Sequence, residues 1–221
     1  MRVDRDGDVH VLTMTSGENR FNLDHLAEIE EALDGVEGAN GRPAAVLTGE
    51  GKFFSNGLDL EWMGGAAEGE AQESVERSMR LMARLLTFPT GVVAAINGHC
   101  FAAGAMLALA CDERVMRADR GFFCLPEVDI DMRFLEGMHR LITLRLAPAT
   151  AHEAMLTGRR YGGGEALAAG IVGATASEDE LVAAAVERAR PYAGKNPEIV
   201  TGMKRDAYAD VVEALHRPLE G

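Results

Sequence analysis

The sequence predicts an α/β fold in which helices cover a mostly parallel sheet and a helical region follows. In the first half, β-rich segments alternate with segments whose apolar residues recur every three or four positions. That order is expected of strands joined by crossover helices. Beyond Leu125 the apolar spacing is helical throughout. The 221 residues are enough for one sizeable core.

The first elements form a strand, helix, strand unit, and the order then repeats. Asn22 precedes the first helix and is available as its N-cap, while Pro89 ends the second helix. The predicted strands are Val9–Met14, Ala44–Thr48, Val92–Ile96, Arg114–Ala118 and Gly121–Leu125. The predicted helices are Leu23–Leu33, Glu73–Leu86, one that starts in the small-residue segment after Gly98, Arg133–Leu146, Ala149–Leu156, Gly164–Ala169, Glu178–Tyr192 and Glu198–Leu215.

Charge and composition exclude several classes of protein. The net charge of -13 would repel polyanions, so neither nucleic acid nor an anionic membrane is an expected partner. No apolar run reaches ~18 residues, and the N-terminal segment carries acids where a secretory signal carries basic residues. We therefore expect a cytoplasmic protein. The three cysteines are widely spaced and metal ligands do not cluster, so neither a disulfide framework nor a metal site is predicted.

Two turns of small residues follow predicted strands and are candidate anion sites. They lie in FFSNGLDL, around Gly57, and in HCFAAGAM, around Gly104. Such turns expose backbone N–H groups, and a helix N-terminus adds a positive dipole. The Asn56 and Ala103 N–H groups are predicted to converge on one oxygen, each contributing about 3 kcal/mol to a transition state. For either turn alone, ordinary loop chemistry remains the alternative.

Three segments resemble the crotonase, or enoyl-CoA hydratase/isomerase, superfamily. They are TGEGKFFSNGLDLEWM (Thr48–Met63), the long segment Val92–Ile130, and LTGRRYGGGEALAAGIV (Leu156–Val172). The resemblance implies repeated ββα units around a parallel sheet core, with a helical C-terminal region. It also implies an acyl-CoA thioester substrate, whose enolate two N–H groups hold. Asn56 and Ala103 match the donors, and Gly104 follows. Coenzyme A would enter as part of the substrate, and no other cofactor is expected.

The carboxylates distinguish activities within that family. Hydratases of the family use two glutamates, and the position of the first is occupied here by Met106, which cannot transfer a proton. Glu127 matches the second. Its neighbours Phe123, Leu125 and Val128 are predicted to desolvate its carboxylate and raise its pKa. One base beside an oxyanion hole suits the shift of a double bond from 3-enoyl-CoA to 2-enoyl-CoA, and the motifs most resemble enoyl-CoA isomerases of plant peroxisomal type.

Further substrate contacts follow from the same resemblance. Arg20 is predicted to face the phosphates of coenzyme A, and Met106 to line the acyl pocket. Asp131 occupies a position where family members usually have glycine, and Glu136 is the next carboxylate that would reach inward. The backbone that passes the adenine and pantetheine is predicted to be that of Phe54, Ser55, Asn56, Gly57 and Leu58.

The resemblance also divides the chain and suggests an assembly. Residues 1–172 are predicted to form the core domain, and residues 173–221 a C-terminal helical region for trimerisation and for covering the site. A homotrimer or hexamer is expected. Alternatives to the isomerase are a hydratase or thioester hydrolase of the same fold, or a member that binds acyl-CoA without catalysis.

Overall fold

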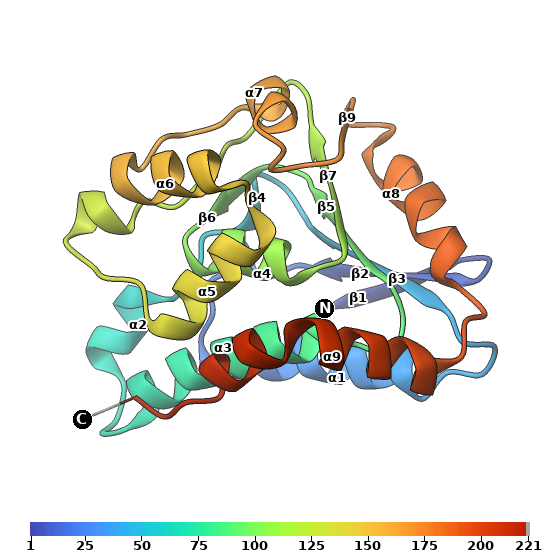
Figure 1. Ribbon diagram of the computed structural model, residues 1–221, viewed down its shortest axis with the longest axis horizontal. Helices are drawn as coiled ribbons and strands as arrows, with labels where there is room; N and C mark the ends of the chain where they lie inside the picture. The colour runs from blue at the N-terminus through green and yellow to red at the C-terminus, as the bar shows by residue number, and fades with distance from the viewer. Residues whose placement is uncertain (220–221) are drawn as a thin grey trace.

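The computed structural model describes residues 1–219 and confirms the α/β class. Within these residues, one sheet has the strand order β1-β2-β3-β5-β7-β9, and a smaller sheet has the order β4-β6-β8 (Figure 1). The strands are β1 Arg2–Asp6, β2 Val9–Met14, β3 Ala44–Gly49, β4 Phe53–Ser55, β5 Val92–Ile96, β6 His99–Phe101, β7 Glu113–Arg117, β8 Phe123–Cys124 and β9 Ala174–Ala176. The helices are α1 Leu23–Glu37, α2 Leu60–Gly65, α3 Glu70–Leu86, α4 Ala103–Ala110, α5 Glu136–Arg145, α6 Pro148–Thr157, α7 Gly163–Ala168, α8 Leu181–Ala189 and α9 Pro197–Leu215, with short 3-10 helices η1 Glu127–Ile130 and η2 Arg190–Tyr192.

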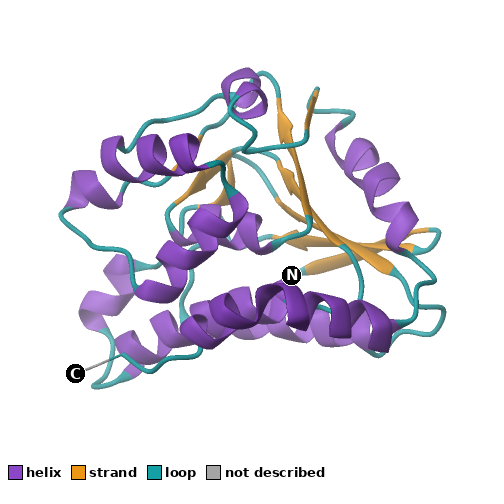
Figure 2. Ribbon diagram, in the orientation of Figure 1, coloured by secondary structure: helices purple, strands orange, loops and turns teal. Residues whose placement is uncertain are grey.

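The large sheet is covered on both faces, as its apolar strands predict. Side chains alternate across a strand, so Val9 and Val11 of β2 pack toward α8, while Leu12 and Met14 join the core on the side of α1, α3 and α4. Figure 2 shows α8 to the right of the large sheet, whereas the other long helices lie to its left and below it. A sheet with two covered faces requires nearly continuous apolar strands, and all of β2, β3 and β5 is buried except part of Gly49.

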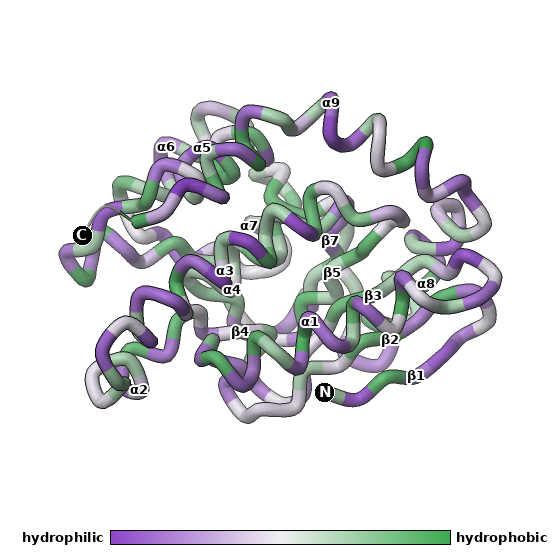
Figure 3. Tube along the Cα trace, turned by 90° about the horizontal axis from the view of Figure 1, so that it is seen from below, coloured by the Kyte–Doolittle hydropathy of each residue, from purple (hydrophilic) through white to green (hydrophobic). Residues whose placement is uncertain are grey.

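The long helices are amphipathic. Along α1 and α9 the hydrophobic and hydrophilic residues alternate turn by turn (Figure 3). Leu26, Ile29 and Leu33 of α1 are fully buried, and the predicted N-cap is confirmed because the Asn22 side chain accepts a bond of 2.9 Å from the His25 N–H. Helix α9 packs against α3 and α5 of its own chain.

Several short elements escaped the sequence pattern. Strand β1 is exposed along its whole length and is defined by antiparallel pairing with β2, not by apolar residues. Strands β4 and β6 have three residues each, which is too short for a periodicity, and α2 buries no residue. The expectation that all elements beyond Leu125 are helical was wrong, since β9 pairs in parallel with β7 and extends the sheet.

The boundary predicted at residue 172 does not separate two cores. Beyond it, β9 joins the large sheet, Leu181 and Val186 of α8 pack on that sheet, and Leu215 of α9 joins the main core. Residues 220 and 221 of the predicted C-terminal region lie outside the described residues. Among residues 1–219, no helix combines the length and apolar character needed to cross a bilayer.

A buried ion pair fastens α9 to the start of the central strand β5. The Asp112 carboxylate accepts bonds of 2.8 Å from both the Lys204 Nζ and the Val92 N–H. Both charged side chains are only 12% exposed. We expect Asp112→Ala to lower the free energy of unfolding by about 3 kcal/mol, because it leaves a buried ammonium and a buried N–H without this acceptor. Urea unfolding measures this value. A loss no larger than that of Arg205→Ala, at an exposed neighbour of Lys204, would contradict it.

Candidate active site

The small sheet gathers the predicted site residues at its carboxyl edge. Strand β4 pairs in parallel with β6, and β6 pairs in parallel with β8. The turn with Asn56 to Leu58 follows β4, Ala103 begins α4 shortly after β6, and Glu127 comes three residues after β8. Because parallel strands end at the same edge, three segments far apart in the sequence meet here. The two glycine turns therefore lie side by side, although β4 and β6, the strands that bring them together, were not predicted from the sequence.

The two turns touch so closely that side chains are excluded between them. A β-carbon at Gly57 would lie 2.9 Å from the Ala103 nitrogen, and one at Gly104 would lie 2.6 Å from the Ser55 carbonyl oxygen. Gly57 also has φ +80, a backbone conformation that favours glycine. The Ser55 Oγ donates to the Asn19 carbonyl at 2.7 Å and accepts from the Gly57 N–H at 3.1 Å. Glycine at both positions therefore sets how near the turns approach.

One of the two backbone N–H donors assigned from the sequence already has an acceptor. The Asn56 N–H is not free, because it donates to the Glu18 carbonyl at 3.0 Å. The neighbouring amide of Leu58 has no acceptor among the described residues, and neither has the Ala103 N–H in the first turn of α4. The pairing of Phe21 with Leu58 accounts for the free Leu58 amide: the Asp59 N–H donates to the Phe21 carbonyl at 3.1 Å, and successive amides of an extended strand point to opposite sides. Among the cavity-lining residues of the two turns, Leu58 and Ala103 are therefore those whose N–H groups have no acceptor within residues 1–219.

Ala102 is a residue that sequence reasoning missed. Its φ of 50 and ψ of -127 are unusual for a residue with a β-carbon, and such a conformation costs about 1–3 kcal/mol. Its N–H donates to the Cys124 carbonyl at 3.1 Å, and its own carbonyl accepts from the Met106 N–H at 3.1 Å. These bonds hold the sharp bend between β6 and α4, which sets the direction of the next amide, that of Ala103. No pattern in the sequence distinguishes this alanine from its neighbours.

Glu127 is a buried carboxylate that forms no ion pair within residues 1–219. Only 7% of the residue is exposed, and its Oε2 is buried without a hydrogen-bond partner among the described residues. Burial raises the pKa of Glu127 from 4.5 to about 7, against a smaller opposing effect of a bond from its own backbone N–H. The predicted neighbours Phe123 and Leu125 are buried with it, whereas Val128 is 43% exposed and contributes no desolvation of that kind. The group is poised to exchange a proton near neutral pH.

A largely apolar cavity of about 540 Å³ connects these groups. Among the described residues that line it, Glu127 is the only carboxylate, and Met106 stands where a second one was considered. Apolar side chains line the cavity from α2, α3 and α5 and from the segment between η1 and α5. They are Leu60, Met63, Val75, Met132, Phe134, Leu135 and Met138. The sequence-predicted residues that line the cavity are Arg20, Asn56, Leu58, Ala103, Met106 and Glu127.

Arg20 lies at the cavity but is surrounded by acids. Its guanidinium contacts Glu18 at 2.7 Å, Glu61 at 3.7 Å and Asp59 at 3.8 Å. Hydrogen bonding to Glu18 raises the pKa of Arg20 further. Three nearby carboxylates reduce the attraction of this side chain for a phosphate, so its predicted role toward coenzyme A has to compete with existing ion pairs.

Other residues predicted to contact the substrate do not line the cavity. Phe54 and Ser55 are fully buried and do not line the cavity, and Gly57 and Gly104 act through the packing of the turns. Glu136 does not reach inward, since it is exposed and forms an ion pair with Arg140.

Asp131 closes η1 in a left-handed conformation with φ 55, which gives a physical reason why glycine suits this position. Within residues 1–219, no group of three or more His, Cys, Asp or Glu side chains is arranged to hold a metal ion.

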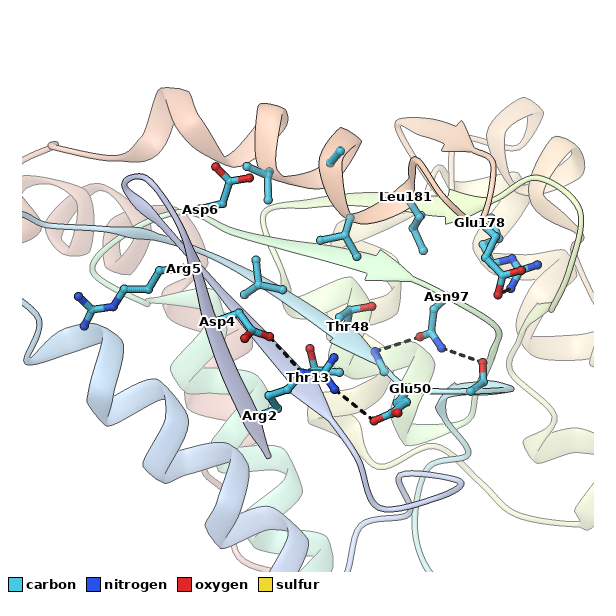
Figure 4. Close-up of a pocket in the computed structure, with 17 residues that line it drawn as sticks. Arg2, Asp4, Arg5, Asp6, Thr13, Thr48, Glu50, Asn97, Glu178 and Leu181 are labelled. Carbon is cyan, nitrogen blue, oxygen red and sulfur yellow. Dashed lines mark hydrogen bonds and ion pairs between the residues drawn. The ribbon is translucent and has the colours of Figure 1, made fainter.

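A second cavity, of about 500 Å³, lies between β1, β3 and α8 (Figure 4). Its charged side chains largely neutralise one another. Arg2 contacts Asp4 at 3.0 Å and Glu50 at 3.5 Å, and Arg117 contacts Glu178 at 2.7 Å. The cavity contains no buried, unpartnered acid or base among the described residues.

Comparison with known proteins agrees with the geometry. The sequence profile of the family described as "Enoyl-CoA hydratase/isomerase" matches residues 4–221. The peroxisomal enoyl-CoA delta isomerase 2 of Arabidopsis thaliana is 34% identical over 225 residues, covering 96% of this chain and 94% of the relative.

Solved structures share the fold. A probable enoyl-CoA hydratase of Mycobacterium tuberculosis superposes with a TM-score of 0.90 and 29% identity, over 98% of this chain and 92% of that one. The human mitochondrial delta3-delta2-enoyl-CoA isomerase superposes with a TM-score of 0.89 and 25% identity, over 97% and 85%.

The buried state of Glu127 makes stability depend on pH. The folded chain holds this proton more tightly than the unfolded chain, because the pKa rises from 4.5 to about 7 on folding. The stabilisation is complete below the unfolded pKa and is lost as pH rises through the folded one, by about 3 kcal/mol in all. We expect Glu127→Gln to remove this pH-dependent stabilisation. In denaturant titrations, its stability relative to the wild type should therefore increase by about that amount between acidic and mildly alkaline pH. A constant difference across that range would contradict the assignment.

Proposed function

The chain belongs to the enoyl-CoA hydratase/isomerase family, and we propose that it moves the double bond of a 3-enoyl-CoA to the 2-position. One observation carries this proposal. Glu127 is the only carboxylate among the described residues of a cavity that also holds two free backbone donors, those of Leu58 and Ala103. A single base can serve both proton transfers of an isomerisation.

The proposed reaction begins at C2 of the substrate. The ionised Glu127 accepts a proton from C2, and the electrons move through C1 onto the thioester oxygen, giving a dienolate. The Leu58 and Ala103 N–H groups donate to that oxygen, and the N-terminus of α4 adds a favourable dipole. Glu127 then returns the proton to C4 while the carbonyl re-forms, which leaves the double bond between C2 and C3. No atom is gained or lost, so no co-reactant is needed.

Hydration is less well served by these residues. Addition of water requires a group that orients and deprotonates the water in addition to one that handles the α-proton. Met106, 1% exposed and lining the cavity, supplies no such group. A hydratase or thioester hydrolase is the second candidate, favoured because some relatives bear hydratase names. A third is an acyl-CoA-binding member without turnover.

The chain is also proposed to assemble as a homotrimer, or as a hexamer of two trimers. Large apolar side chains are exposed on neighbouring elements, a pattern typical of protein interfaces. They are Val128 and Ile130 of η1, Leu144 of α5, Leu156 of α6 and Leu167 of α7, between 39% and 59% exposed. The cytoplasmic location expected from the N-terminal sequence stays a prediction, and the Arabidopsis relative is named peroxisomal.

Isomerase activity is tested by following the appearance of the conjugated thioester from a 3-enoyl-CoA. We expect conversion by the wild type, with kcat/KM rising with pH through about 7 because Glu127 must be ionised to accept the proton. Glu127→Gln should lower the rate about 10²–10⁴-fold. Asp129→Asn, at an exposed carboxylate of the same 3-10 turn, is the control and should behave as the wild type. Full activity in Glu127→Gln would contradict the mechanism. Binding of acyl-CoA without conversion by the wild type would favour a member that binds without turnover.

The assembly is tested by light scattering after gel filtration. The wild type should elute at three or six times the 23.7 kDa of one chain. A charge at Leu156, as in Leu156→Glu, should shift it to the monomer because the apolar contact would then bury a carboxylate. Val3→Glu, on the exposed edge strand β1, should leave the mass unchanged. A monomeric wild type would contradict the proposal.

A further inference from the structure

The segment after α9 forms part of the wall of the active-site cavity. Leu219 lines the cavity together with Val75 of α3, and it is partly buried against the main core. Figure 1 shows this segment leaving α9 and passing along the N-terminal half of α3, on the side where α2 also lies. Residues far apart in the sequence therefore share one cavity with Glu127.

Polar contacts attach this segment to both helices that flank the cavity. The Leu219 N–H donates to the Glu76 Oε1 of α3 at 3.1 Å, while Arg217 forms an ion pair with Glu136 at the start of α5. Glu76 is itself held in place, since its Oε1 accepts from the Gln72 side chain at 2.9 Å and its Oε2 lies 3.6 Å from the Arg80 guanidinium. Residues 217–219 thus form a strap that runs from α5 to α3.

The cavity wall beside this strap suits the hydrocarbon part of a substrate. Val75, Leu135 and Met138 line the cavity from α3 and from the beginning of α5, the two elements that the strap joins. Among the polar lining residues, Arg20 precedes α1 and Asn56 follows β4, both away from those two helices. Arg133 precedes α5, but it is exposed. Pantetheine amides need polar partners, whereas an acyl chain gains free energy from apolar walls. The acyl chain therefore extends toward the strap.

We propose that Leu219 ends the acyl tunnel and limits the length of the acyl chain, with Glu76 as the residue that positions it. This inference rests on the proposed acyl-CoA substrate but does not depend on which reaction follows. The cavity then accepts acyl chains that reach no farther than Leu219. Longer chains are excluded by a side chain that a backbone bond and an ion pair hold in place.

The test compares acyl-chain profiles of variants. Calorimetric titration with butyryl-, octanoyl- and palmitoyl-CoA gives Kd values that need no turnover, so a failure of the isomerase proposal leaves this result readable. We expect the wild type to discriminate against palmitoyl-CoA. Leu219→Ala should improve its binding at least about 10-fold, the worth of roughly two newly buried methylenes, and leave butyryl-CoA unchanged. Leu219→Trp should weaken octanoyl-CoA selectively.

Two further variants separate positioning from general stability. Glu76→Ala should shift the profile in the same direction as Leu219→Ala, because the Leu219 N–H loses its acceptor, whereas Glu76→Gln keeps an acceptor oxygen and should retain the wild-type profile. Met203→Ala, on a 69% exposed position of α9, is the matched control. An unchanged order of Kd values in Leu219→Ala, or an equal loss for all three thioesters, would overturn the proposal.

Discussion

The contact between the turn after β4 and the start of α4 is the constraint on which the candidate site depends. It exists because three-residue strands pair in parallel and end at one edge. The contact needs Gly57 and Gly104, because a β-carbon at either would clash with the opposite turn. Ala102 bends the backbone between β6 and α4 at a cost in strain. The result is a pair of amides, Leu58 and Ala103, without partners in the described part of the chain.

Glu127 is the electrostatic counterpart of those amides. A lone carboxylate in an apolar site destabilises the folded protein once it ionises, and a hydrogen-bonded or paired carboxylate would avoid this loss. The chain retains the unpartnered group and has Met106 instead of a second acid in the same cavity. A base with a pKa near neutrality is useful for removing a weakly acidic carbon-bound proton. The ionised Glu127 thus lowers the stability of the folded protein, and the proposed chemistry requires that ionised form.

The sequence predicted the long elements well and the site in part. Strands β2 and β5 were located at their observed bounds because their apolar residues are continuous. Helix α9 was located to within one residue because its apolar spacing extends over many turns. Glu127, Ala103 and Met106 were identified through motifs, and all three line the cavity. The donor in the first turn was assigned to Asn56 and not to Leu58, because the bond from the Asn56 N–H to the Glu18 carbonyl forms only in the folded chain. Leu219 belongs to the cavity only through tertiary packing, which no local pattern encodes.

In the proposed mechanism, one buried carboxylate carries the same proton from C2 to C4. The most direct measurement is the isomerisation of a 3-enoyl-CoA that carries two deuterons at C2, followed by mass spectrometry or NMR of the product after a single turnover. Because Glu127 is only 7% exposed, exchange of its proton with water should be slow, and we expect a product with deuterium at C4. A product with deuterium retained only at C2, and none at C4, would contradict it.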